Sequence, residues 1–211
     1  MADGRWPPVY DPEDVKRAIA TLASGAAADS TRFYGTIDPA SGDLCQGDVV
    51  QFHSGLPAID EQGEISVAEE VDFWFVLGNS CDYNRSLDEV PSFLASPLYE
   101  LPEATPVEFL GDLRWYRLSR SFFLPRWPGA PGSLGFVADL TKIAMFSRRL
   151  LATESAQPMV VKKRWHFGNE PRPRSRAVVV ARLSQDAWLL LNAALVRFLA
   201  RDDGRYDAAN G

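Results

Sequence analysis

The stretch from Val71 to Leu77 constrains the fold more than any other part of the sequence. Its residues are apolar at every position except Asp72. A strand with apolar side chains on both faces has to be covered on both faces, as in the middle of a sheet. The stretch therefore predicts a buried, central strand. The polar residues 78–84 that follow are of the types that form tight turns.

Two amphipathic segments predict helices near the two ends of the chain. In the first, Asp11 is a candidate N-cap, Pro12 suits the first turn and Gly25 ends the pattern. In the second, Ser184 is a candidate N-cap for a helix over Gln185–Arg201. The core-facing stripe expected of this second helix comprises Trp188, Leu191, Leu195, Phe198 and Leu199.

Shorter apolar stretches predict further strands at 33–37, 47–53, 115–118, 121–124, 135–140 and 178–180. The spacing of Ile143, Phe146 and Leu150 predicts a helix over 143–150. Residues 54–63 are expected to form a loop, and the proline-rich stretch 86–110 is expected to be irregular with one short helix.

Several short strands with helices at the ends favour an α+β fold built on a small, curved antiparallel β-barrel, with an N-terminal helix and a long C-terminal helix. We expect residues 1–30 to form the N-terminal helix and linker, 31–203 a single barrel-containing domain, and 204–211 a frayed tail. A parallel sheet is disfavoured because no helix separates the two clearest strands.

Composition supports a globular protein. Of the 211 residues 46% are hydrophobic and 11% aromatic, enough for a sizeable core. No apolar run approaches the roughly 18 residues of a membrane span, and the first residues lack the layout of a secretory signal. The two cysteines are too few for a disulfide framework. These features predict a cytoplasmic protein that does not bind membranes.

Charge is divided unevenly along the chain. Residues 1–110 contain 5 basic and 20 acidic residues, whereas residues 111–211 contain 17 basic and 8 acidic ones. Either the two halves attract each other within the fold, or the basic half binds an acidic partner.

A basic stretch with aromatic residues lies within the basic half. Lysine and arginine bind phosphates, and flat aromatic rings stack on exposed bases. The candidate nucleic-acid or partner-binding residues are Lys162, Lys163, Arg164, Trp165, Arg172, Arg174 and Arg176. The alternative is a basic loop that docks on the acidic half with its aromatic rings buried.

Cys81 is the candidate nucleophile, because it follows the buried strand. Catalysis by a thiol needs a nearby base, for which His53 is the candidate, with Asp48 or Asp82 to orient the imidazole. The interpretation we prefer is a buried structural cysteine, and we expect Cys81 to alkylate more slowly than Cys45 in the folded protein. The cysteine and histidine spacing does not match a zinc site, and no cofactor or metal is expected.

Two segments resemble a known family. Gly47-Asp48-Val49-Val50 opens one strand, and Phe75-Val76-Leu77-Gly78-Asn79-Ser80-Cys81-Asp82 ends the next. Their layout is similar to PemK/MazF-type SH3-like barrels of toxin–antitoxin systems, over roughly residues 45–85. The family has an Arg-Pro pair before the second strand, and this arginine serves RNA cleavage. Here Glu69-Glu70-Val71-Asp72 occupies that place, so the catalytic arginine has no counterpart.

The full order of motifs also resembles uncharacterised bacterial proteins with a Cys-Asp turn. Together the resemblances imply an SH3-like barrel of bacterial origin. Our leading interpretation is a non-enzymatic binding module for a macromolecular partner, in a toxin–antitoxin, phage or defence setting. The alternatives are a PemK/MazF-like ribonuclease or RNA-binding protein with a displaced site, and a thiol-dependent enzyme that uses Cys81.

Overall fold

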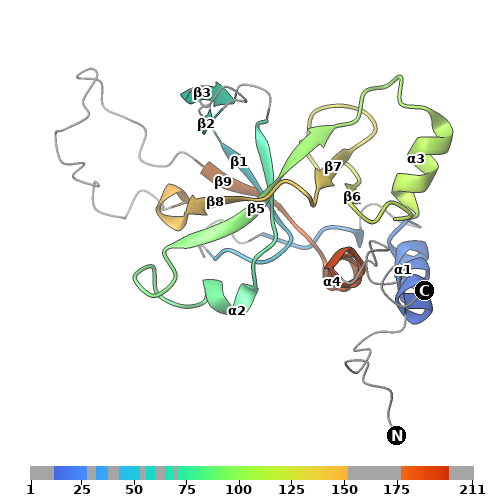
Figure 1. Ribbon diagram of the computed structural model, residues 1–211, viewed down its shortest axis with the longest axis horizontal. Coiled ribbons are helices and arrows are strands. Elements are labelled where there is room, and N and C mark those ends of the chain that lie inside the picture. Colours follow the sequence, from blue (N-terminus) through green and yellow to red (C-terminus); the bar gives the residue numbers. More distant parts are fainter. Residues whose placement is uncertain are drawn as a thin grey trace, which may run out of the picture. The chain divides into compact units, whose positions relative to one another are not determined.

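The computed structural model describes residues 12–27, 32–37, 43–52, 56–59, 65–68, 71–151 and 177–199 (Figure 1). The chain forms two compact units. Unit 1 draws on Met1–Gly35, Tyr99–Lys142 and Leu183–Gly211, and unit 2 draws on Thr36–Leu98 and Ile143–Arg182. The two units therefore alternate along the sequence.

Unit 2 is built on antiparallel strands. Its strands are β1 (Asp48–Phe52), β4 (Phe73–Val76), most of β5 (Ser92–Glu100), β8 (Ala144–Ser147) and β9 (Ala177–Arg182). They pair in the order β9-β1-β4-β5-β8. The short helix α2 (Ser80–Tyr83) follows β4, and the 3-10 helix η2 (Arg148–Leu151) follows β8. Strands β2 (Leu56–Ile59) and β3 (Ile65–Ala68) form a separate two-stranded sheet.

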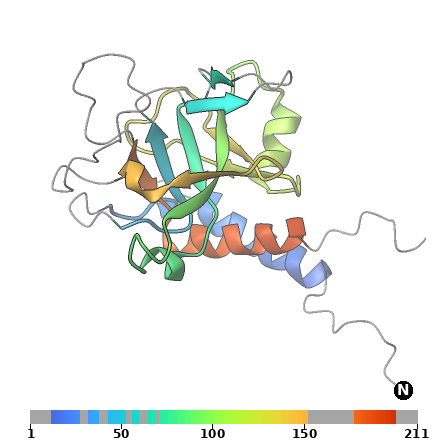
Figure 2. The ribbon, with the colours of Figure 1, turned by 60° about the vertical axis from the view of Figure 1, so that its left-hand side comes forward.

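Unit 1 combines helices with a hairpin. Its elements are α1 (Pro12–Ala27), α3 (Val107–Arg114), β6 (Ser121–Leu124), β7 (Phe136–Asp139) and α4 (Gln185–Leu199). Strands β6 and β7 pair in antiparallel fashion. Helices α1 and α4 lie side by side, as Figure 2 shows. Buried residues on α1 are Ile19 and Ala23, and those on α4 include Leu190, Leu191 and Ala194.

The predicted α+β class is confirmed. Seven strands belong to one antiparallel sheet in the order β6-β7-β5-β4-β1-β9, with β8 beside β5, and helices lie near both ends of the chain. Within the part of the chain that the structure describes, no pairing joins β6 to β9, so the strand order is open. No helix in those ranges is both long and apolar enough to cross a membrane.

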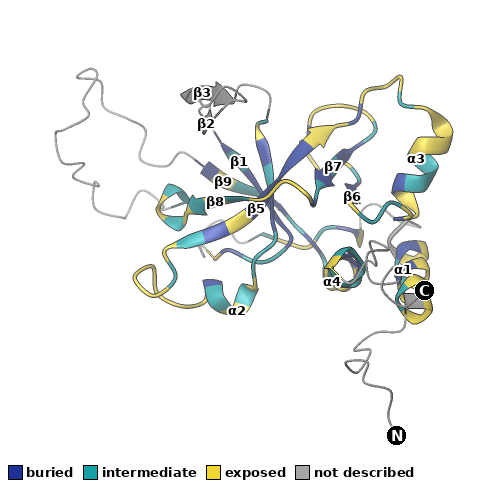
Figure 3. Cartoon of the chain, in the orientation of Figure 1, coloured by how far each residue is buried: buried dark blue, intermediate teal, exposed yellow. Residues whose placement is uncertain are grey.

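The central strand predicted at 71–77 is confirmed as β4, which lies between β1 and β5. Phe75 and Val76 are fully buried on the two faces of β4, and Val76 packs in one buried cluster with Val50 and Phe93. Figure 3 colours the buried residues dark blue. Trp74 is half-buried and packs edge-on against Phe146, with ring centroids 4.7 Å apart. The apolar core of unit 2 therefore forms around β4.

The stretch 86–110, expected to be irregular apart from a short helix, contains the nine-residue strand β5 as well as α3. Pro97 is compatible with this strand. The carbonyl of Leu94 accepts from the N–H of Leu77, so alternate residues of β5 bond toward β4 and the Pro97 nitrogen faces the other edge. Pro97 therefore costs no hydrogen bond to β4, and the pairing of β5 with β8 ends before it, at Ala95.

Four further expectations were wrong. Residues 144–147 form β8, not a helix: the spacing of Ile143, Phe146 and Leu150 fits a helix, but half-buried Ala144 and Phe146 also alternate with exposed Met145, as in a strand. Trp115 caps α3, and no strand forms at 115–118. The loop expected at 54–63 contains strand β2. At 33–37 only Tyr34 forms a bridge, to Leu183.

Helix α4 begins as predicted. The Ser184 hydroxyl accepts a hydrogen bond from the N–H of Ala187 at 3.3 Å. Its buried stripe, however, is Ala187, Leu190, Leu191 and Ala194. Of the expected stripe only Leu191 is fully buried, whereas Leu199 is 78% exposed. The expected stripe was wrong because two of the residues that face the core are alanines, whose small side chains contribute little to an apolar pattern in the sequence.

The central position of β4 predicts a large cost for truncating its buried ring. Phe75→Ala should lower the free energy of unfolding by about 3–5 kcal/mol, because the cavity is enclosed on all sides. Phe109→Ala is the matched control, since Phe109 on α3 is 46% exposed. Urea denaturation of both variants measures the difference. Equal losses would contradict a core centred on β4.

Candidate functional site

The most polar buried feature of unit 2 is an ion pair between β1 and β9. Asp48 is 0% exposed and lies opposite Arg182 in the strand register. Arg182 donates from Nε to Asp48 Oδ1 at 2.8 Å and from Nη2 to Asp48 Oδ2 at 2.9 Å. This is the two-pronged geometry in which arginine binds a carboxylate most strongly.

A tight turn before β1 completes the surroundings of Asp48. The backbone N–H of Cys45 donates to Asp48 Oδ2 at 2.7 Å, and the N–H of Asp48 donates to the Cys45 carbonyl at 3.1 Å. Gly47 has a φ of 87°, which favours glycine. Its N–H donates to the Val76 carbonyl at 2.8 Å, which holds the turn against the end of β4.

Burial and charge shift the ionisation of these groups. Burial raises the pKa of Asp48, while hydrogen bonds from Arg182 and Cys45 oppose the rise. The hydrogen bonds with Asp48 raise the pKa of Arg182. Burial and the Asp48 charge raise the pKa of the Cys45 thiol above its ordinary 9.0. A thiol with a raised pKa is a poor nucleophile at neutral pH.

Asp48 therefore has a structural role. Its two carboxylate oxygens accept three hydrogen bonds from Arg182 and Cys45, which join β1 to β9 and to the turn before β1. The structure brings Asp48 together with Cys45 and Arg182, and it records no contact from Asp48 to Cys81 or Asp82. Arg182 follows the predicted strand 178–180 and had no role in the sequence analysis.

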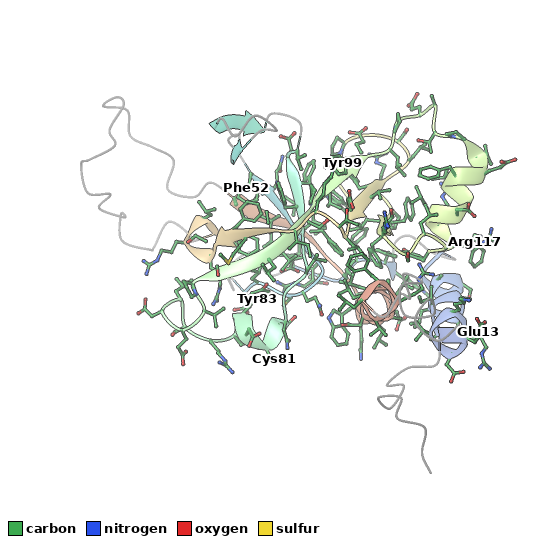
Figure 4. All side chains as sticks on the ribbon, viewed as in Figure 1. Glu13, Phe52, Cys81, Tyr83, Tyr99 and Arg117 are labelled. Carbon is green, nitrogen blue, oxygen red and sulfur yellow. The ribbon has the colours of Figure 1, made fainter. Side chains whose placement is uncertain are left out.

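Cys81 corrects the expectation of a buried thiol. It lies in α2 at the periphery of unit 2 and is exposed (Figure 4). The polar turn expected here is a short helix, whose N-cap Asn79 accepts from the N–H of Cys81 at 3.0 Å. Asn79 therefore caps the turn, as its residue type indicated. Over the described ranges no group of three or more metal-ligating side chains is present.

Several candidate residues lie outside the described residues. They are His53 and the basic set Lys162, Lys163, Arg164, Trp165, Arg172, Arg174 and Arg176. Their roles in catalysis or binding stay predictions from the sequence.

An exposed apolar surface was missed by the sequence analysis. Met145 on β8 and Leu94 on β5 are direct partners in the register, so their side chains share one face of the sheet. They are 70% and 44% exposed, and Ile143, two residues before Met145, is 53% exposed. We call Leu94, Ile143 and Met145 the outer apolar surface. The signal for this surface in the sequence was the strand-like alternation of residues 143–147, but we predicted a helix over 143–150.

Comparisons with models of protein families, with curated proteins and with solved structures find no match to this chain.

The ion pair predicts that replacing Asp48 lowers the free energy of unfolding strongly. Asp48→Asn should lower the free energy of unfolding by about 3–5 kcal/mol, because it leaves the Arg182 charge partly buried without a counter-ion. Asp112→Asn is the matched control. It removes the surface pair with Arg117, whose side chain is 68% exposed, and should cost about 1 kcal/mol or less. Urea denaturation measures both losses. Similar losses would show that the buried pair stabilises the fold no more than the surface pair does.

The two thiols should differ in reactivity. We expect iodoacetamide to label Cys81 several-fold faster than Cys45 at neutral pH, because Cys81 is exposed and the Cys45 pKa is raised. Labelling of Cys45 should still accelerate as the pH passes 9, where its thiolate forms. In urea the two rates should converge. Mass-spectrometric mapping of the peptides over time measures both, and faster labelling of Cys45 in the folded protein would refute the expectation.

Proposed function

We propose that this chain is a non-enzymatic binding module of bacterial origin for a macromolecular partner, and that unit 2 binds a protein through the outer apolar surface. The observation that supports this proposal most is the joint exposure of Leu94, Ile143 and Met145 on two neighbouring strands. Neighbouring exposed apolar side chains on a sheet are typical of protein-binding surfaces. Leu77, which is half-buried and bonded to Leu94 in the same row, extends the surface onto the end of β4.

The arrangement of polar residues supports binding rather than thiol chemistry. The Asp48 carboxylate is hydrogen-bonded to Arg182. Among the described residues, Cys81 has no base or cation within hydrogen-bond distance. Cys45, the other thiol, lies beside the Asp48 carboxylate, which disfavours its ionised form. Among the described residues, neither thiol therefore has the surroundings that a nucleophilic cysteine needs.

The sequence resemblance to PemK/MazF-type barrels supplies a second candidate. The resemblance, over roughly residues 45–85, falls on β1 and β4, which pair in antiparallel fashion in unit 2. An SH3-like barrel that binds RNA, in a toxin–antitoxin, phage or defence setting, is thus the alternative.

An affinity experiment separates the two candidates. The tagged full chain is incubated with bacterial extract, and the bound protein and RNA are both quantified. Met145→Asp should reduce recovery of a protein partner at least tenfold, because a charge replaces the most exposed apolar group of the surface. Val107→Asp on α3 is the control, since Val107 is 84% exposed and lies in unit 1. Both changes should leave stability within about 0.5 kcal/mol of the parent.

The outcomes are distinct. Loss of one protein with Met145→Asp and its retention with Val107→Asp would support the proposed surface. Recovery of RNA in place of protein, falling steeply with salt, would favour the second candidate. Equal recovery of a protein partner by all three chains would show that the outer apolar surface is not the binding site.

A further inference from the structure

Strand β8 has one edge without a neighbouring strand in the part of the chain that the structure describes. On its other edge it pairs with β5, from Ser92 opposite Ser147 to Ala95 opposite Ala144. The two strands at the ends of the sheet order differ, because helices contact them: α3 contacts β6, and η2 contacts β9. An unpaired edge offers a row of backbone N–H and C=O groups, to which an extended segment of another chain can bond.

The hydrogen bonds of β5 show which groups of β8 point toward its unpaired edge. The Leu94 carbonyl accepts from the N–H of Leu77, and the Leu94 N–H donates to the Tyr83 hydroxyl at 3.3 Å. The Leu94 backbone therefore faces away from β8. Since Leu94 is the register partner of Met145, the N–H and C=O of Met145 face away from β5. Two residues later, the N–H of Ser147 points to the same side.

The side chains beside this edge are apolar. Ile143, just before β8, and Met145 are 53% and 70% exposed. On the opposite face Phe146 is only half-buried, although its ring packs against those of Phe52 and Trp74 with centroids 5.1 and 4.7 Å apart. Edge strands that avoid pairing usually carry a lysine, a proline or a bulge. Strand β8 contains neither residue, and its register with β5 is continuous.

We propose that the protein partner of unit 2 binds as an extended segment that adds a strand to the unpaired edge of β8. The segment bonds to the N–H and C=O of Met145 and to the N–H of Ser147. Its side chains lie alternately beside the outer apolar surface and beside Phe146, so they are apolar on both faces and of the types that favour strands. This inference rests on the proposed function and deepens it, because it names the form in which the partner is recognised.

Peptide selection on the full chain tests the inference. A phage library of random linear peptides is the probe, and the Kd of one enriched peptide is measured by fluorescence anisotropy. We expect the enriched peptides to share a run of β-branched and aromatic residues. Ser147→Pro should weaken binding at least tenfold, because proline removes the outward N–H while the bonds of β8 to β5 remain. Ser147→Ala is the matched control and should leave the Kd unchanged.

A second measurement covers the case in which Ser147→Pro disturbs folding, which circular dichroism reports. It leaves the protein unchanged and removes the peptide's own N–H groups by backbone N-methylation, one position at a time. A strand bonds to its neighbour through every second residue. Methylation should therefore weaken binding at least tenfold at alternate positions and have little effect at the positions between them.

The outcomes separate this inference from the proposed function. Binding that is lost with Met145→Asp but withstands both Ser147→Pro and N-methylation would overturn the added strand and retain the outer apolar surface as a binding site. Binding that withstands Met145→Asp would overturn both. A selection that enriches no peptide would overturn the inference. So would a parent chain that sediments as a dimer dissociated by Ser147→Pro, because a second copy would then occupy the edge.

Discussion

The ion pair between Asp48 and Arg182 connects the first and last strands of unit 2. The two residues are 134 positions apart in the sequence, yet two hydrogen bonds join them at 2.8 and 2.9 Å. Asp48 also holds the turn at Cys45, and that turn is bonded to the end of β4. The pairing of β1 with β9 and the placement of β4 therefore depend on one carboxylate. A buried carboxylate that loses its partner is costly, so this register is strongly specified.

This use of Asp48 bears on function. The Asp48 carboxylate is used to join two strands, and the exposed Cys81 has no activating neighbour among the described residues. What unit 2 presents to solvent is an apolar row across β5 and β8. A surface of this kind supports recognition of another macromolecule.

The sequence predicted elements whose local pattern is strong. The apolar run at β4 and the capped helix α4 are examples, because one explanation fits each pattern. Strand β5 was missed because Pro97 and the prolines on either side of the strand suggested a loop, and only the pairing with β4 shows that Pro97 removes no hydrogen bond there. Residues 144–147 fit both periodicities, and pairing with β5 decided between them. The partner of Asp48 could not be found locally, since nothing near Asp48 marks an arginine 134 residues away.

The alternation of the two units has a consequence for synthesis on the ribosome. Strand β1 emerges 134 residues before Arg182, the residue that neutralises its carboxylate. At ordinary rates of translation this interval lasts roughly 10 s. Throughout it the β9 side of β1 has no strand to pair with, and Asp48 must remain hydrated. Unit 1 is also incomplete until α4 is made. The nascent chain therefore completes both units almost together, once β9 and α4 have emerged, and a truncated chain that stops before Arg182 can complete neither.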